Sequence, residues 1–302
     1  MSIIEIGQDN RHLSVERGFL VIQDNDSDIA RIPYDTIDAI IVTAFHLTYS
    51  NHLLKTLCEK NIPLIICGEN FHPSGILLGS FGHYRQAEII LQQTNASKPL
   101  IKKIWRTIIK AKITNQAHLL KHAGKKFNDL LELEKNIPSG DSNNTEGVAA
   151  QRYWPRLLGN DFRRNTNDPG LNVCLNYGYS ILRAAMARAI VTSGLHPAIG
   201  IHHCNQTNPF QLVDDLMEPF RPFIDNAIKN IATPDIKLTP DIKRTLVMVL
   251  NNPVNLANKT YTLQNAMQEV VRSFASSLAQ GKDLLISPLI ISIRISADDV
   301  NY

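Results

Sequence analysis

Three short segments of the chain contain residue types that can hold a divalent metal ion. They are NTEGVAAQRYW at residues 144–154, which includes Glu146, GLHPAIGIHHCN at residues 194–205, and DDLMEPFRP at residues 214–222. Carboxylate and imidazole groups are common ligands of Mg²⁺ and Mn²⁺. Together the segments supply the oxygen and nitrogen ligands for an ion that could activate a phosphodiester.

The first two segments also have ordinary structural interpretations. Glu146 follows an Asn/Thr cap and lies in the first helical turn, where the helix dipole favours a carboxylate without any metal. His202 and His203 are adjacent, so their side chains point in different directions and at most one is expected to bind a given ion. A single histidine can simply pack or form a hydrogen bond. His203 with Cys204 suggests zinc, but no second pair at finger-like spacing completes four ligands.

The third segment places acids on one face of a helix. Asp214, Asp215 and Glu218 are separated by steps of three and four residues. Carboxylates crowded in this way need a cation, Arg221 or solvent to compensate their charge. An exposed acidic helix end remains the alternative to a metal site.

The charge of the chain is unevenly distributed. Residues 1–94 hold 6 Lys/Arg against 11 Asp/Glu, whereas residues 95–302 hold 25 against 17. Residues 98–126 contain nine basic residues and no acid, which fits either a solvated face or contact with a phosphate backbone. The candidates for DNA binding are Lys102, Arg106, Arg152, Arg163 and Arg164. Arg152 also fits an ion pair on its own helix, and the last two also fit solvated loop charges.

The aromatic residues near these segments have two interpretations. They could stack on bases, but aromatic residues at helical spacing more often belong to a core. The residues concerned are Tyr153, Trp154, Tyr177 and Tyr179.

The N-terminal part of the chain has the pattern of a small β-rich domain. Short β-branched and aromatic runs are separated by turn residues, at 19–22, 37–42, 62–66 and 76–78. Residues 50–59 interrupt this pattern with a Ser start and the apolar spacing of one amphipathic helix. We therefore expect a β-rich domain at residues 1–83.

The rest of the chain is predicted to be helical. After a linker at residues 84–97, Ser97 is a plausible cap, and Pro99 suits the first turn of a helix. Residues 136–145 have the composition of a mobile loop. The predicted helices are 98–126, 171–193, 211–232 with interruptions at Pro219 and Pro222, 241–250, and 263–279. The predicted fold is α+β: a small N-terminal β-rich domain followed by a larger all-α catalytic domain at residues 98–302.

The composition restricts the cellular setting. The four cysteines have no paired metal-ligand spacing, and no secretory signal precedes them. Disulfides are therefore not expected, and a cytoplasmic location is expected. No apolar stretch approaches the length of a membrane span, so no membrane partner is expected.

In their combination and order, the three segments resemble the CRISPR-associated integrases of the Cas1 family. The pattern of that family is E-G-x-A-A, then G-x-x-H, then D-L-x-E-P-F-R-P, and the resemblance extends to the length, the β-rich beginning and the N-Y-G-Y segment at residues 176–179. Carried over to this chain, it places the catalytic metal ligands at Glu146, His203 and Glu218, with Asp215 as an auxiliary acid. Glu218 stands where many relatives have Asp, and His202 makes the choice of His203 open to an error of one residue.

The resemblance implies an enzyme that inserts short double-stranded DNA fragments into a repeat array. A DNA 3′ hydroxyl attacks a phosphodiester with the help of Mg²⁺ or Mn²⁺, and no nucleotide cofactor is needed. The implied partners are fragment DNA, repeat-array DNA, a second copy of the chain in a homodimer and the small protein Cas2. The motif wording looks most like type II systems, in which an effector nuclease also takes part.

Two other functions remain open at this point. A structure-selective metal-dependent DNA endonuclease would use the same residues with water as the nucleophile. A non-catalytic DNA-binding assembly protein would use Glu146 as a cap, His203 as a packed residue and the acids of 214–218 as exposed charges.

Overall fold

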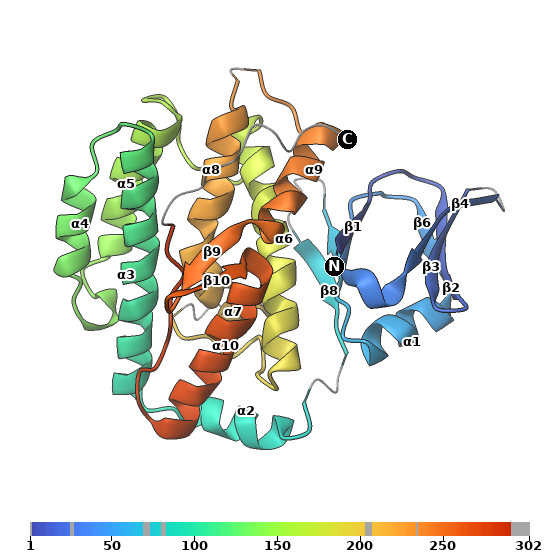
Figure 1. Cartoon of the computed structure of the whole chain (residues 1–302), viewed down its shortest axis with the longest axis horizontal. Helices are drawn as coiled ribbons and strands as arrows, with labels where there is room; N and C mark the ends of the chain where they lie inside the picture. Colours follow the sequence, from blue (N-terminus) through green and yellow to red (C-terminus); the bar gives the residue numbers. More distant parts are fainter. Residues whose placement is uncertain are drawn as a thin grey trace.

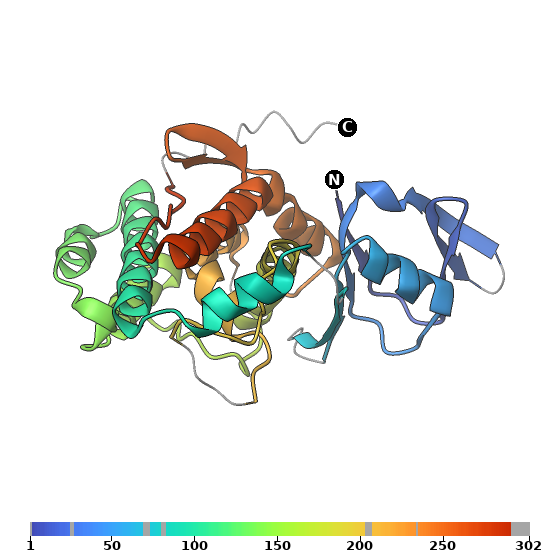
Figure 2. The ribbon, with the colours of Figure 1, turned by 90° about the horizontal axis from the view of Figure 1, so that it is seen from below.

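A computed structural model of the chain describes residues 2–24, 27–68, 73–79, 83–202, 207–233 and 235–290. Most strands gather at one end of the molecule and most helices at the other, and two perpendicular views agree on this separation (Figures 1 and 2). The predicted α+β class, with a β-rich beginning and a helical remainder, is confirmed.

The β-rich part consists of two four-stranded sheets. The first has the order β1-β5-β7-β8, and the second has the order β4-β3-β2-β6. Strand β5 (Ile37–Val42) is buried at all six positions because it lies between two parallel neighbours, and five of its six residues are apolar. The other strands are β1 (Ser2–Ile6), β2 (Arg11–Glu16), β3 (Phe19–Asp24), β4 (Ser27–Pro33), β6 (Leu47–Tyr49), β7 (Leu64–Cys67) and β8 (Pro73–Leu77).

The helix predicted at residues 50–59 is confirmed as α1 (Asn51–Glu59). Its Ser50 side chain accepts a hydrogen bond from the backbone amide of Leu53 at 3.1 Å and so caps the helix. Leu53 and Leu57 pack into the core of the β-rich part together with Leu13 and Ile40.

The helical part begins earlier than predicted. Helix α2 (Gln86–Thr94) lies within the segment expected to be a linker, and its buried Gln93 ties it to the helical part. Helix α3 (Lys98–His122) starts at Ser97 as predicted and ends four residues early. The remaining helices are α4 (Asn128–Lys135), α5 (Thr145–Leu158), α6 (Leu171–Thr192), α7 (Gln211–Met217), α8 (Arg221–Ile231), α9 (Pro240–Met248) and α10 (Leu263–Gln280).

The central element of the helical part is α6, which lies between the sheets and the outer helices (Figure 1). It is buried along most of its length and contacts α7, α8, α9 and α10. The outer helix α3 packs against α4, α5 and α8. Because α3, α5 and the α7–α8 junction meet on one side of the core, residues far apart in sequence are brought together there.

One β-hairpin in this part was not predicted. Strands β9 (Pro253–Leu256) and β10 (Lys259–Thr262) pair through a two-residue turn in which Ala257 and Asn258 have φ of 50° and 65°. Positive φ at both central residues is the geometry that joins a tight antiparallel hairpin.

Two charged contacts join the β-rich and helical parts. Arg188 of α6 forms an ion pair with Asp38 of β5. Glu5 of β1 accepts a hydrogen bond from the Tyr177 hydroxyl at 2.8 Å and pairs with Lys243 of α9 at 2.5 Å. In the described part of the chain, no helix is both long enough and apolar enough to cross a membrane.

Candidate active site

The N-terminus of helix α5 is capped by residues that precede Glu146. The Asp141 carboxylate accepts hydrogen bonds from the backbone amides of Thr145 at 2.8 Å and Glu146 at 3.0 Å, and the Asn144 side chain accepts one from Gly147 at 3.2 Å. Asp141 and Asn144 have φ of 49° and 51°, so the chain turns back on itself here. The segment expected to be a loop is therefore a tight capping turn, and the Glu146 side chain is not needed as a cap.

Glu218 lies at the junction between α7 and α8. It begins a short 3-10 helix, η3 (Glu218–Phe220), where Pro219 and Pro222 supply no backbone amide and suit the first turn of a new helical segment. Glu218 is 3% exposed and Asp215 is fully buried. The alternative of an exposed acidic helix end is therefore wrong for both residues.

Glu146 and Glu218 face each other across one lysine. Lys112 Nζ lies 2.5 Å from Glu146 Oε1 and 2.6 Å from Glu218 Oε2, and Arg221 Nη2 lies 2.9 Å from Glu218 Oε1. The pair of acids comes from α5 and η3, whereas the lysine comes from α3. We call these four residues the candidate site.

Both cations of the candidate site remain charged, although Lys112 is buried and Arg221 is partly buried. Burial by itself lowers the pKa of Lys112, but the charges of Glu218 and Glu146 raise it above its ordinary value. Burial likewise lowers the pKa of Arg221, and Glu218 and neighbouring groups raise it above its ordinary value. The candidate site therefore contains two carboxylates compensated by two permanent cations.

Lys112 was not distinguished from the other basic residues of its segment by the sequence. It lies four residues after Ile108 and seven before Leu119, on the apolar face of α3, and it is 9% exposed. A lysine at a buried position of an amphipathic helix needs an acidic partner. The position of Lys112 on the apolar face of the helix was therefore the sequence signal that it pairs with acidic residues.

Asp215 holds the loop that leads to the predicted histidine ligand. Its Oδ2 accepts hydrogen bonds from the backbone amides of Ile201 at 2.6 Å and His202 at 3.0 Å. The His202 ring stacks on Trp105 of α3, with ring centroids 4.3 Å apart and planes at 4°. His203 lies outside the described residues. Asp215 holds the backbone of the two residues that immediately precede His203 in the chain.

Gln93 of α2 holds the same loop from another side. Its side-chain amide donates to the carbonyl oxygens of His196 at 3.0 Å and Ile199 at 2.8 Å, and its oxygen accepts from the His196 amide at 2.9 Å. Gln93 was not predicted from the sequence, because three backbone contacts of one glutamine leave no pattern along the chain.

A buried hydrogen-bond network connects the helices behind the candidate site. The Asp225 carboxylate accepts from the hydroxyls of Tyr153 at 2.8 Å and Tyr179 at 2.6 Å. Burial raises the pKa of Asp225 to about 6 although both hydrogen bonds oppose this rise. The Arg221 guanidinium lies 4.8 Å from the centroid of the Tyr179 ring. Because Tyr153, Tyr177 and Tyr179 are buried, their interpretation as core residues is confirmed.

The five candidates for DNA binding differ in their surroundings. Lys102 and Arg106 are exposed on α3, and neither has an ion-pair partner among the described residues. Arg152 pairs at 3.2 Å with Asp129, which belongs to α4 and not to its own helix.

The last two candidates form hydrogen bonds near their own positions in the chain. Arg163 donates to the carbonyl oxygens of Asn160 and Phe162. Arg164 donates to the side chains of Asn172 and Asn176.

The candidate site has the chemistry of a cation site. Two carboxylates already converge on one ammonium group, so the space between them suits a positive charge. Oxygen ligands match Mg²⁺ and Mn²⁺. The described residues contain no group of three or more His, Cys, Asp and Glu placed to hold a metal ion. Among the described residues, Glu146 and Glu218 are the two predicted ligands that lie together, and His203 stays the predicted third.

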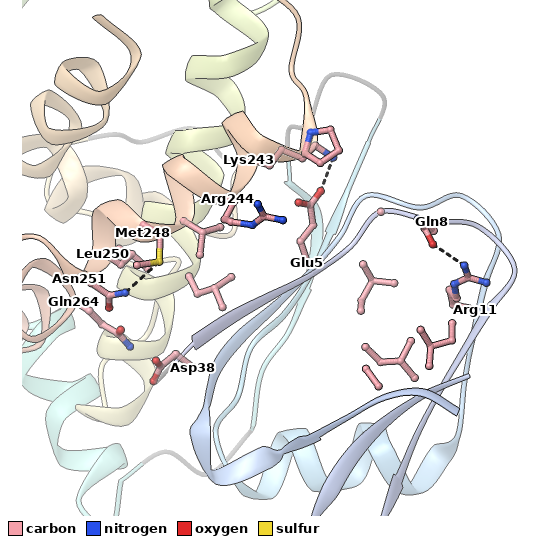
Figure 3. Close-up of a pocket in the computed structure, with 18 residues that line it drawn as sticks. Glu5, Gln8, Arg11, Asp38, Lys243, Arg244, Met248, Leu250, Asn251 and Gln264 are labelled. Carbon is pink, nitrogen blue, oxygen red and sulfur yellow. Dashed lines mark hydrogen bonds and ion pairs between the residues drawn. The ribbon is translucent and has the colours of Figure 1, made fainter. Parts of the chain in front are cut away.

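A cavity of about 620 Å³ lies elsewhere, at the boundary between the β-rich part and α9. Figure 3 shows Glu5 of β1 and Lys243 of α9 reaching toward each other at this boundary, with Arg244 nearby. Glu5 also accepts a hydrogen bond from the Thr43 hydroxyl at 3.0 Å. None of the candidate-site residues lines this cavity, and Glu5 is already occupied by its three partners.

Comparison with known sequences identifies one family. The model described as CRISPR associated protein Cas1 matches residues 4–241. The chain is 34% identical over 276 residues to the CRISPR-associated endonuclease Cas1 of Neisseria meningitidis serogroup C (strain 8013), with 90% of each chain covered. It is 29% identical over 241 residues to a CRISPR-associated endonuclease Cas1 of Pyrobaculum aerophilum, with 70% of this chain and 76% of that protein covered.

Solved structures share the fold. A casposase bound to an integration product superposes with a TM-score of 0.77 at 22% identity, covering 94% of this chain and 92% of the casposase. A Cas1 protein from Thermotoga maritima superposes with a TM-score of 0.76 at 17% identity, covering 94% and 98%.

Proposed function

The chain belongs to the Cas1 family of CRISPR-associated proteins, and from this premise we propose that it is a metal-dependent DNA integrase of CRISPR adaptation. It inserts short double-stranded DNA fragments into a repeat array. The observation that carries the proposal is the convergence of Glu146 and Glu218, 72 residues apart in sequence, on Lys112. Such convergence of a buried acid, Glu218, and a partly buried one, Glu146, is costly to the fold unless a cation occupies the space between them.

The reaction exchanges one phosphodiester for another. The 3′ oxygen of a fragment forms a bond to the phosphorus at the repeat boundary, and the bond from that phosphorus to the target 3′ oxygen breaks. The attacking hydroxyl loses its proton to solvent, and the leaving oxygen gains one. Because the number of phosphodiesters is unchanged, no nucleotide is consumed.

The residues of the chain have separate roles in this reaction. Glu146, Glu218 and His203 would hold Mg²⁺ or Mn²⁺, which supplies polarisation of the phosphate when bound. Arg221 orients Glu218 through their ion pair at 2.9 Å. Asp215 is the auxiliary acid expected from the sequence, and it acts by holding the backbone of Ile201 and His202.

DNA and protein partners complete the proposal. Exposed Lys102 and Arg106 are the best placed of the predicted residues to bind phosphates, because Arg163 and Arg164 are engaged within their own part of the fold. Structures similar to this one include a Cas6-RT-Cas1–Cas2 complex, with a TM-score of 0.75, and a Cas1–DNA complex, with a TM-score of 0.53. We extend this to fragment DNA, repeat DNA, Cas2 and a homodimer, and to an effector nuclease of a type II system.

A hydrolytic, structure-selective endonuclease is the second candidate function. The relatives from Neisseria meningitidis and Pyrobaculum aerophilum are both named endonucleases, and this observation favours it. The same acids would serve a water nucleophile, so the product separates the two functions: joined DNA for the integrase and cut DNA for the endonuclease. A non-catalytic assembly role would leave the buried acids of the candidate site without a purpose.

A plasmid integration assay tests the proposal. Labelled fragment DNA, a repeat-bearing plasmid, Cas2 and Mn²⁺ or Mg²⁺ are incubated with the wild type or with Glu146→Ala, His203→Ala or Glu218→Ala. The label should join the plasmid with the wild type but with none of these three variants, and only without EDTA. Glu269→Ala, which removes a surface acid of α10 paired with Arg272, is the matched control and should retain activity. Cutting without joining would favour the endonuclease, and unimpaired joining by the three variants would refute the site.

A further inference from the structure

Lys112 occupies a place that an ordinary surface lysine does not. Its side chain is 11% exposed, and its ammonium group touches both acids of the candidate site. The eight other basic residues of the segment 98–126 include Lys110, which is 39% exposed and pairs with Glu134 of α4 at 3.0 Å. Lys110 thus shows what a peripheral ion pair on the same helix looks like.

The lysine and the two carboxylates depend on one another. A buried ammonium group without a partner would destabilise the fold, and the adjacent carboxylates of buried Glu218 and partly buried Glu146 would repel each other without it. With all three present, the ammonium group of Lys112 forms an ion pair with each carboxylate, at 2.5 Å from Glu146 and 2.6 Å from Glu218. The geometry of Glu146 and Glu218 is therefore set before any metal ion arrives.

We infer that Lys112 is the resident cation of the candidate site, and that a divalent metal ion must displace its ammonium group from at least one carboxylate in order to bind. The inference rests on the proposed function, since it takes Glu146 and Glu218 as metal ligands. Lys112 is a positioning residue in this role: it preorganises the acids and competes with the metal.

The charge balance explains why such a lysine suits the reaction. The charges of Glu146 and Glu218 are matched by those of Lys112 and Arg221, so these four residues together carry no net charge without a metal ion. A divalent ion adds two positive charges, a bound phosphodiester removes one, and the attacking oxygen removes the second in the transition state. With metal bound, the positive charge of the site is therefore balanced by the negative charge of the transition state. Interactions that are stronger in the transition state than in the ground state accelerate a reaction. Metal and DNA should consequently favour each other's binding.

Mn²⁺ binding to the full-length protein tests the inference without relying on activity. Free Mn²⁺ is measured by its electron paramagnetic resonance signal, with no DNA present. Lys112→Met should bind Mn²⁺ at least about tenfold more tightly than the wild type, because a competing positive charge has been removed from the site. Lys110→Met, the matched control, should bind Mn²⁺ as the wild type does.

Thermal unfolding gives a second measurement on the same proteins. Without metal, Lys112→Met should unfold about 5 °C or more below the wild type, because two buried carboxylates have lost their cation. Saturating Mn²⁺ should raise its unfolding temperature by more than it raises that of the wild type. Equal or weaker Mn²⁺ binding by Lys112→Met would overturn the inference, as would an equal rise in unfolding temperature.

A duplex with dideoxy 3′ ends, which cannot react, measures the coupling. It should tighten Mn²⁺ binding by at least about fivefold in the wild type and by less in Lys112→Met, which is no longer limited by excess positive charge. The same coupling in both proteins would contradict the charge balance.

Lys112→Arg keeps the test possible if Lys112→Met does not fold. A guanidinium group binds carboxylates in a fork and remains charged, so this variant should stay folded and bind Mn²⁺ at least about threefold more weakly than the wild type. Unchanged affinity would overturn the inference. Glu146→Ala and Glu218→Ala separate the two proposals: if they bind Mn²⁺ as the wild type does, the metal site of the proposed function fails, whereas if they lose binding and the Lys112 variants are normal, only the role of Lys112 fails.

Discussion

The Asp141 carboxylate accepts a hydrogen bond from the backbone amide of Glu146 at 3.0 Å, and so the residue that caps helix α5 is five positions before the candidate metal ligand. The second carboxylate oxygen of Asp141 accepts a hydrogen bond from the backbone amide of Thr145. This leaves the Glu146 side chain available to cross to α3, where it meets Lys112.

Asp141→Ala should therefore lower the free energy of unfolding by about 2 kcal/mol, because two buried amides lose a charged acceptor. Asp141→Asn should lose less, since its amide oxygen still accepts one bond. Urea unfolding measures both. Asp168→Ala removes an exposed loop carboxylate that accepts from Asn165, and it should change stability by less than about 0.5 kcal/mol. Equal effects of Asp141→Ala and Asp168→Ala would show that the cap is unimportant.

Asp215→Leu should reduce DNA strand transfer by about tenfold to a hundredfold, the range found when a residue that orients a metal ligand is lost. The loop before His203 would lose the acceptor of two backbone amides. The Mn²⁺ concentration for half-maximal transfer should rise as well. A general loss of protein stability would lower the rate at saturating Mn²⁺ without causing this rise. Asp215→Asn retains an acceptor oxygen and should be impaired less. The prediction fails if leucine and asparagine at this position behave alike.

Asp225 should make the protein less stable as pH rises from about 4 to about 7. Its folded pKa of about 6 lies above its ordinary value of 3.8 because the group is buried, so the folded state holds a proton that the unfolded state has already lost. This contribution is complete below pH 3.8 and is lost as pH passes 6. Its size is at most about 3 kcal/mol.

Comparison with Asp225→Asn isolates this contribution. Urea unfolding of both proteins at pH 4, 5, 6 and 7 should show the wild type losing stability relative to the variant over this range, by about 1 to 3 kcal/mol in total. The charges that face Asp225, from Lys112 and Arg221, are present in both proteins. A difference that does not change with pH would exclude the titration of Asp225.

Glu5 and Lys243 should contribute a measurable coupling across the two parts of the fold. Their side chains are 18% and 16% exposed and their ion pair is 2.5 Å long. A double-mutant cycle with Glu5→Gln and Lys243→Met should give a coupling of about 1 to 2 kcal/mol in thermal or urea unfolding. The neighbouring pair Asp241 and Arg244 is exposed and should give less than about 0.5 kcal/mol. Two equal couplings would argue against a role in joining the domains.

Gly178 is required by the close packing of α6 against α8. A Cβ atom at this position would lie inside van der Waals contact with Ile224 Cγ2. Gly178→Ala should therefore destabilise the protein by about 1 to 3 kcal/mol. The double variant Gly178→Ala, Ile224→Leu removes the opposing methyl group and should recover at least half of that loss. Gly75→Ala, where a Cβ meets nothing within 4 Å, is the control. No recovery in the double variant would mean that another contact is responsible.

Local sequence signals predicted most of the long helices and strands β3, β5, β7 and β8, but not strands β1, β2, β4 and β6 or helix α4. The Ser50 and Ser97 caps begin helices α1 and α3, and the prolines at 219 and 222 interrupt a helical segment as expected. Helix α2 was missed because the segment 84–97 was interpreted as a junction, although Ile89 and Ile90 give it apolar side chains. The β9–β10 hairpin was missed because its short strands lie among helices. Its turn residues, Ala257 and Asn258, are a weak signal by themselves.

The sequence by itself determined the change from a β-rich to a helical part, the uneven charge, and the motifs that contain Glu146, His203 and Glu218, because capping, periodicity and motif spacing are properties of residues close together along the chain. Only the tertiary structure decided which charges meet. Lys112 is one of nine basic residues in its segment until α3 packs against α5 and η3, and Asp215 is one of three neighbouring acids until the loop before it folds back. The reason is physical: burial and ion pairing depend on surfaces that come together from distant parts of the chain.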